Sequence, residues 1–151
     1  LNKQMMSGIS QFLDSFAQFT ERLPANYKYC VEIRNPNYLE KKYFEFLQSH
    51  QLYHVFMQGY YMPSIFDIYK RFQEMIRDVA VIRLHGGDRK DIEMKTGKEW
   101  NKIVEPKNKD ISNLVTMISD LESRNTKPFI YVNNHFEGSA PRTINRVLDL
   151  L

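Results

Sequence analysis

The chain has 151 residues, of which 42% are apolar and 26% are charged, and its formal net charge is +3. This composition indicates one globular domain and excludes a disordered chain, while the mild, scattered charge makes nucleic acid an unlikely partner. The single cysteine, Cys30, excludes an internal disulfide and a cysteine-rich zinc site, so we expect the reducing cytoplasm. No apolar run is long enough to cross a membrane, and the opening segment is too polar for a signal peptide.

The first half of the chain alternates helical and extended patterns. Residues 7–23 place apolar side chains on one stripe, which predicts an amphipathic helix that ends at Pro24. Residues 27–34 are rich in β-formers and predict a strand in which Cys30 is a small core residue. We then expect a helix, a strand and a second helix over 38–50, 52–58 and 64–76.

The second half continues the alternation around a long polar segment. A strand over 79–85 leads into residues 86–108, which we expect to be a loop with one helical turn near Trp100. Residues 110–125 predict an amphipathic helix with Asp110 as its N-cap. A strand over 128–134 follows, and the helix expected over 139–151 has the apolar stripe Ile144, Val147, Leu148 and Leu151.

One helix followed by four strands that alternate with helices predicts βαβ units and a parallel sheet, hence an α/β fold. Four parallel strands cannot close a barrel. The alternatives are therefore a small open sheet and a part of something larger.

Three of the predicted strands end in polar side chains. Glu32 and Arg34 share one face of the first strand, and Arg83 and His85 share one face of the third. Asn133 lies on the Tyr131 face, near the end of the last strand. Functional groups of parallel sheets gather at the carboxyl ends of the strands, so these side chains predict one concave site.

Polar groups on one face favour a barrel, whose interior mouth can be polar, over an open sheet with helices on both faces. On this interpretation, the same face of strand 52–58 carries His54, Phe56 and Gln58. The alternative for Glu32 and Arg34 is a structural ion pair, because an unpaired buried charge is too costly.

Other chemistries have weaker support. Gly86 and Gly87 either let the backbone approach a ligand or only form a turn. Residue types that bind metals, such as Asp88 and His135, lack a ligand spacing like HExxH, so we assign no metal, and the cofactor stays unknown. Trp100 is either part of a lid over the site or part of a plain surface loop.

The three strand ends together resemble the YecE-like family, known as domain of unknown function 72. Its signatures correspond to VEIRNPNY at 31–38, VIRLHGG at 81–87 and IYVNNHFEGSAPRTINRVLDLL at 130–151. The resemblance implies a TIM-barrel-like fold in which residues 1–151 form a single domain, the last four βα units of a (β/α)8 barrel. It implies no activity, because the family has none that is settled.

From these residues we expect an enzyme acting on a small anionic metabolite, phosphorylated or carboxylated. Glu32 and His85 are the candidate catalytic residues, and the candidate ligand-binding residues are Arg34, Arg83, Asn133 and Asn134. The alternatives are a non-catalytic binding protein, for nucleic acid or a protein partner, and an inactive scaffold fragment. A half barrel exposes apolar edges, so we also expect pairing with a second copy or with a missing N-terminal half.

Overall fold

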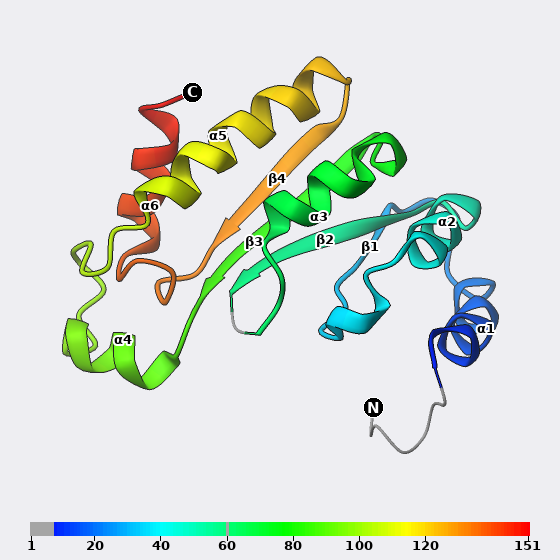
Figure 1. Ribbon diagram of the computed structural model, residues 1–151, viewed down its shortest axis with the longest axis horizontal. Helices are drawn as coiled ribbons and strands as arrows, with labels where there is room; N and C mark the ends of the chain where they lie inside the picture. The colour runs from blue at the N-terminus through cyan, green and yellow to red at the C-terminus, as the bar shows by residue number, and fades with distance from the viewer. Residues whose placement is uncertain (1–7, 60) are drawn as a thin grey trace.

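The computed structural model describes residues 8–59 and 61–151 as a parallel sheet with helices packed against it (Figure 1). The strands are β1 (Tyr29–Val31), β2 (Leu52–Gly59), β3 (Val79–Gly86) and β4 (Lys127–Val132). The α-helices are α1 (Ile9–Thr20), α2 (Lys41–Ser49), α3 (Ile65–Phe72), α4 (Arg89–Thr96), α5 (Asn108–Ser123) and α6 (Ala140–Leu148). Short 3-10 helices cover Pro36–Tyr38 and Gln73–Met75.

The strands pair in parallel in the order β1-β2-β3-β4, which confirms the predicted α/β fold with a parallel sheet. Helices α2, α3, α5 and α6 pack against one face of this sheet. In β3 the side chains of Ala80, Ile82 and Leu84 are fully buried in the main core. The alternate residues Val81, Arg83 and His85 are only half-buried on the other face, here called the open face.

The register corrects the predicted orientation of β2. Val55 lies beside Val81 and Met57 beside Arg83, so the open face of β2 carries the odd-numbered residues. The prediction that His54, Phe56 and Gln58 share the face of Arg83 is therefore wrong. Both faces of β2 are largely buried, so its apolar pattern does not distinguish them.

His54 shows why a histidine is tolerated on the helix-covered side. Its side chain is buried, and its Nδ1 lies 3.1 Å from the Tyr43 hydroxyl. The rings of Phe44 and Phe56 meet it edge-on at centroid distances of 5.1 and 4.6 Å. Burial lowers the pKa of His54 to about 3, so the imidazole is neutral in the folded protein at ordinary pH.

Residues 86–108 are not the continuous loop that their polarity suggested, because they contain α4. Asp88 caps this helix by accepting hydrogen bonds from the amides of Lys90 and Asp91 at 2.7 and 3.4 Å. The helix ends at Gly97, which has a left-handed φ of 62°. Trp100 lies in a turn, not in a helical turn as predicted.

The structure also corrects three predicted details, which concern Asp110, Cys30 and the apolar stripe of α6. Asp110 is not an N-cap, because α5 begins two residues earlier and Lys107 holds that position. Cys30 is exposed on the open face, because it pairs with Tyr53 in β2. In the α6 stripe only Val147 is buried, while Ile144, Leu148 and Leu151 are exposed. The reason is that α6 packs mainly on α5 and β4, which cover the side of the helix that carries Val147.

Among the described helices, none combines the length and the apolar character that a membrane crossing requires.

Candidate functional site

An ion-pair cluster lies at the carboxyl ends of β1 and β3, where the sequence predicts the site. Glu32 directly follows β1, and its carboxylate accepts a hydrogen bond from Arg34 Nε at 2.8 Å. Its second oxygen accepts a hydrogen bond from Arg83 Nη1, which reaches across from β3. The Glu32 side chain is 17% exposed, whereas those of Arg34 and Arg83 are 53% and 37% exposed. One shielded carboxylate therefore orients two guanidinium groups that remain open to solvent.

The electrostatics of this cluster hold Glu32 ionised. Burial of the carboxyl opposes ionisation, but the hydrogen bonds and charges of Arg34 and Arg83 outweigh it and lower the pKa of Glu32. A carboxylate with a lowered pKa is a weak base. The geometry therefore suits Glu32 to positioning the two arginines.

His85 lies two residues after Arg83 on the same face of β3. Burial lowers its pKa, and the positive charges of Arg83 and Arg34 lower it further. The imidazole is thus neutral near pH 7 and can accept a proton.

The backbone directly after His85 is tightly packed, and this packing requires a glycine at position 86. Gly86 has a φ of +94°, and a Cβ built there would lie 2.1 Å from the carbonyl oxygen of His135. A side chain at this position would be strained and would collide with the loop after β4. Gly86 therefore lets two strand ends approach each other, whereas a Cβ at Gly87 would meet nothing within 4 Å.

Asn133 and Asn134 shape the turn that follows β4. The amide oxygen of Asn133 accepts from the backbone N–H of His135 at 2.9 Å. That of Asn134 accepts from the N–H of Ala140 at 2.8 Å, in the first turn of α6. In both side chains the amide NH2 is the group that can donate to a ligand.

Arg83, His85 and Asn133 line a small cavity of about 100 Å³ together with Tyr131. The structure thus brings Arg83 together with His85 and Asn133, and with Glu32 and Arg34 through the ion pairs. Asn134 does not line this cavity but a neighbouring one.

The neighbouring cavity has a volume of about 380 Å³ and lies between α4 and the turn after β4. Its lining consists of Arg89, Glu93, Lys98, Trp100, Asn133, Asn134 and His135. Sequence reasoning missed this cavity because it treated residues 86–108 as a loop. A capping aspartate, a terminal glycine and the (i, i+4) pair of Arg89 with Glu93 were the available signals for α4.

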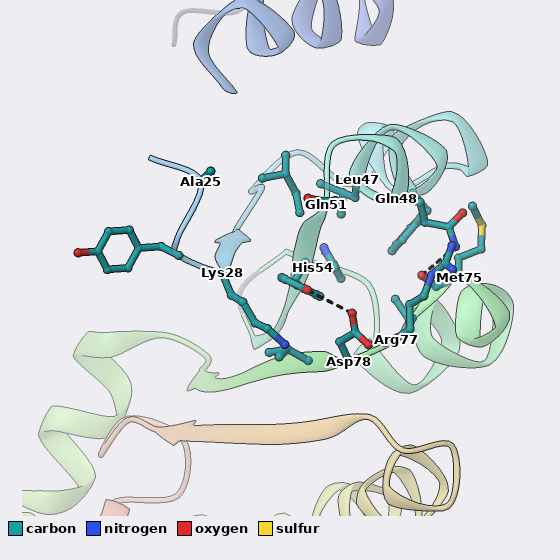
Figure 2. A pocket seen from close by; sticks show the side chains of 15 residues that line it. Ala25, Lys28, Leu47, Gln48, Gln51, His54, Met75, Arg77 and Asp78 are labelled. Carbon is teal, nitrogen blue, oxygen red and sulfur yellow. Dashed lines mark hydrogen bonds between the residues drawn. The ribbon is translucent and has the colours of Figure 1, made fainter. Parts of the chain in front are cut away.

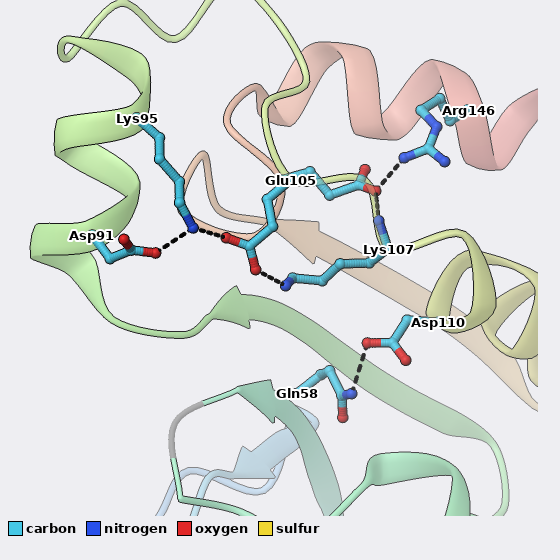
Figure 3. Close-up of polar contacts among 8 residues, drawn as sticks. Gln58, Asp91, Lys95, Glu105, Lys107, Asp110 and Arg146 are labelled. Carbon is cyan, nitrogen blue, oxygen red and sulfur yellow. Dashed lines mark hydrogen bonds and ion pairs between the residues drawn. The ribbon is translucent and has the colours of Figure 1, made fainter.

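A network of charged side chains ties α4 to α5 (Figure 3). Lys95 bridges Asp91 and Glu105 at 2.5 and 3.1 Å, and Lys107 binds the other oxygen of Glu105 at 2.6 Å.

Glu137 continues this network into the interior and was not singled out from the sequence. Its side chain is fully buried and accepts hydrogen bonds from Thr143 Oγ1 at 2.8 Å, from the Lys107 N–H at 2.6 Å and from Arg146. It thereby binds the backbone of Lys107, the N-cap residue of α5, and joins that helix to α6.

A larger cavity of about 460 Å³ lies at the opposite, amino ends of the strands (Figure 2). Its polar contacts are internal: the Tyr53 hydroxyl donates to Asp78 at 3.3 Å, and Gln48 Nε2 donates to the Met75 carbonyl at 3.3 Å. In parallel βα folds this end serves stability, whereas chemistry collects at the carboxyl ends. Volume alone therefore does not make it the functional site.

The described residues contain no group of three or more histidine, cysteine, aspartate or glutamate side chains placed to hold a metal ion.

Comparison with known proteins identifies the family and the fold. The family described as "Protein of unknown function DUF72" matches residues 4–151, which confirms the resemblance to the YecE-like family. A DUF72 family protein from Thermotoga maritima is 20% identical and superposes with a TM-score of 0.64, over 91% of this chain and 50% of its own. One from Enterococcus faecalis is 12% identical, with a TM-score of 0.65 over 97% of this chain and 57% of its own. The chain thus spans about half the length of these relatives, and no curated protein matches it.

Proposed function

Because the chain belongs to the DUF72 family, whose function is unknown, we propose its function from the site itself: the cleft at the carboxyl ends of β1, β3 and β4 binds a small anionic metabolite, phosphorylated or carboxylated. The observation that carries this proposal is the pair of arginines held by one carboxylate. Arg34 and Arg83 bring two positive charges against the single negative charge of Glu32, and both are open to solvent. An oriented guanidinium fork matches a phosphate or carboxylate group.

We propose His85 as the general base of this site and Asn133 as a hydrogen-bond donor to the ligand. The neutral imidazole lies beside the cationic pair and can accept a proton from a bound substrate. Glu32 contributes by orienting the arginines. We place the protein in the cytoplasm, where phosphorylated metabolites occur and where a single cysteine stays reduced.

The test is a titration with inorganic phosphate, followed by NMR of the histidine rings. The chain has four histidines, so the His85 signal can be assigned by its loss in His85→Gln. We expect a saturable shift of the His85 ring, and at least roughly tenfold weaker phosphate binding in Arg83→Ala, which corresponds to about 1.4 kcal/mol. Arg22→Ala is the matched control, because Arg22 is exposed and lies at the end of α1.

An unchanged phosphate affinity in folded Arg83→Ala would contradict the proposal, as would a His85 ring that does not respond. In the latter case the cluster of Glu32 with the two arginines would be structural.

We further propose that the sheet is the last four strands of an eight-stranded barrel, and that a second copy of the chain or the missing N-terminal half completes it. The aligned part of this chain covers only 50% and 57% of the two relatives. On the open face of the edge strand β4, Phe129 and Tyr131 are 39% and 60% exposed. All strands run parallel, so a twofold axis along the barrel would set β4 of one copy beside β1 of the other in the same direction.

The mass in solution tests this pairing. We expect sedimentation equilibrium to give a dimer, and Tyr131→Lys to shift it toward the monomer by placing a charge at the strand edge. The matched control is Met94→Lys, because Met94 is also an exposed apolar side chain but lies on α4, outside both edge strands. A wild-type chain that is monomeric throughout the measured concentrations would refute pairing with a second copy.

A further inference from the structure

The cavity beside the arginine cluster has features of a second binding position. It adjoins the small cavity of Arg83 and His85, because Asn133 lines both. Its volume of about 380 Å³ falls within the usual range of small-molecule sites, about 300–1,000 Å³.

Glu93 is the fixed acceptor of this cavity. Its side chain is 18% exposed, and Arg89 Nε donates to its Oε1 at 2.6 Å. His135 Nε2 lies 3.9 Å from the same oxygen. The hydrogen bond from Arg89 lowers the pKa of Glu93 and keeps the carboxylate ionised. It therefore accepts hydrogen bonds and donates none.

Trp100 supplies an apolar wall. Its ring meets the His135 ring edge-on, with centroids 5.1 Å apart and an interplanar angle of 77°. The His135 backbone is in turn fixed by Asn133 and by the close approach of Gly86. The aromatic wall thus rests on the rigid turn after β4.

An ionised acceptor, two amide groups and one aromatic wall match a sugar ring. Hydroxyl groups donate to a carboxylate and accept from amide NH2 groups, while the C–H face of the ring packs on an indole.

We propose that the cavity of Glu93, Trp100 and His135 binds the sugar part of a sugar phosphate, whose phosphate lies on Arg34 and Arg83. This inference rests on the proposed function, because the phosphate position is the anion site described above. Two cationic side chains line the cavity. Arg89 is paired with Glu93, and Lys98 follows the C-cap of α4.

Tryptophan fluorescence tests the sugar position, because Trp100 is the single tryptophan of the chain. The probes are glucose 6-phosphate, ribose 5-phosphate and inorganic phosphate. We expect at least one sugar phosphate to change the emission of Trp100 saturably. Inorganic phosphate should shift the His85 ring in NMR and leave the emission unchanged.

Glu93→Gln and Glu93→Asp should weaken the sugar phosphate at least tenfold while leaving the affinity for inorganic phosphate at His85 unchanged. Asp91→Asn is the matched control, because Asp91 lies on the same helix and pairs with Lys95. Circular dichroism verifies that each variant is folded, and the aspartate variant retains a carboxylate to pair with Arg89.

Two outcomes would overturn the inference. One is a response of Trp100 to inorganic phosphate equal to that to the sugar phosphates, which would make the cavity a second anion site. The other is a His85 ring that responds to phosphate while no sugar phosphate changes the emission of Trp100. A His85 ring that does not respond to phosphate refutes the proposed function itself, so the two failures are distinguishable.

Discussion

The buried imidazole of His54 should make the stability of this protein depend on pH above the range where carboxylates titrate. Burial lowers the pKa of His54 from 6.5 to about 3. The unfolded chain therefore binds a proton below pH 6.5 that the folded protein does not accept. The unfolding free energy therefore falls as the pH falls from 6.5 toward 3.

The magnitude follows from the two pKa values. Between pH 8 and pH 5 the protonation of His54 in the unfolded chain should cost about 2 kcal/mol of unfolding free energy. For a domain of this size, that is a fall in Tm of roughly 4–8 °C. His85 adds a loss of the same sign, because its pKa is also lowered by burial.

The assay is urea unfolding at pH 8, 7, 6 and 5 for the wild type and for His54→Phe. Phenylalanine fits the aromatic cluster of Phe44 and Phe56 but removes the titrating group. It also removes the hydrogen bond between the Tyr43 hydroxyl and His54, which costs about 1 kcal/mol at every pH. We expect the variant to be less stable than the wild type at pH 8. Between pH 8 and pH 5, its unfolding free energy should fall by about 2 kcal/mol less than that of the wild type. Parallel pH dependences in the two proteins would refute this reasoning.

Two further predictions concern positions where the tertiary structure leaves no freedom. Glu137→Gln should destabilise the fold by about 3–5 kcal/mol in urea unfolding, because it leaves the partly buried Arg146 without its carboxylate. Glu122→Gln, on the exposed surface, is its control, and equal effects would contradict the structural role of Glu137. Gly86→Ala should cost roughly 2–4 kcal/mol in thermal unfolding, through its positive φ and the contact with the His135 carbonyl. Gly87→Ala should stay within about 0.5 kcal/mol, and a harmless Gly86→Ala would disprove the close packing of the two strand ends.

Local patterns were sufficient to predict four strands in a parallel sheet and the face on which the polar ends of β1 and β3 lie. The alternation of Arg83 and His85 with Ile82 and Leu84 repeats every two residues, which is the period of a strand. The same alternation places Glu32 toward the open face. Side-chain direction along one strand depends on the backbone alone, so it is visible in the sequence.

Only the tertiary structure decided how separate segments meet. The face of His54 depends on the register of β2 between its neighbours, and both of its faces are largely buried. The backbone N–H of Lys107, the N-cap residue of α5, finds its acceptor in Glu137, 30 residues further along the chain. The cavity of Glu93 and Trp100 exists because α4 lies beside the turn after β4. Contacts between distant segments leave no periodic signal in either segment, so length, composition and local pattern cannot specify them.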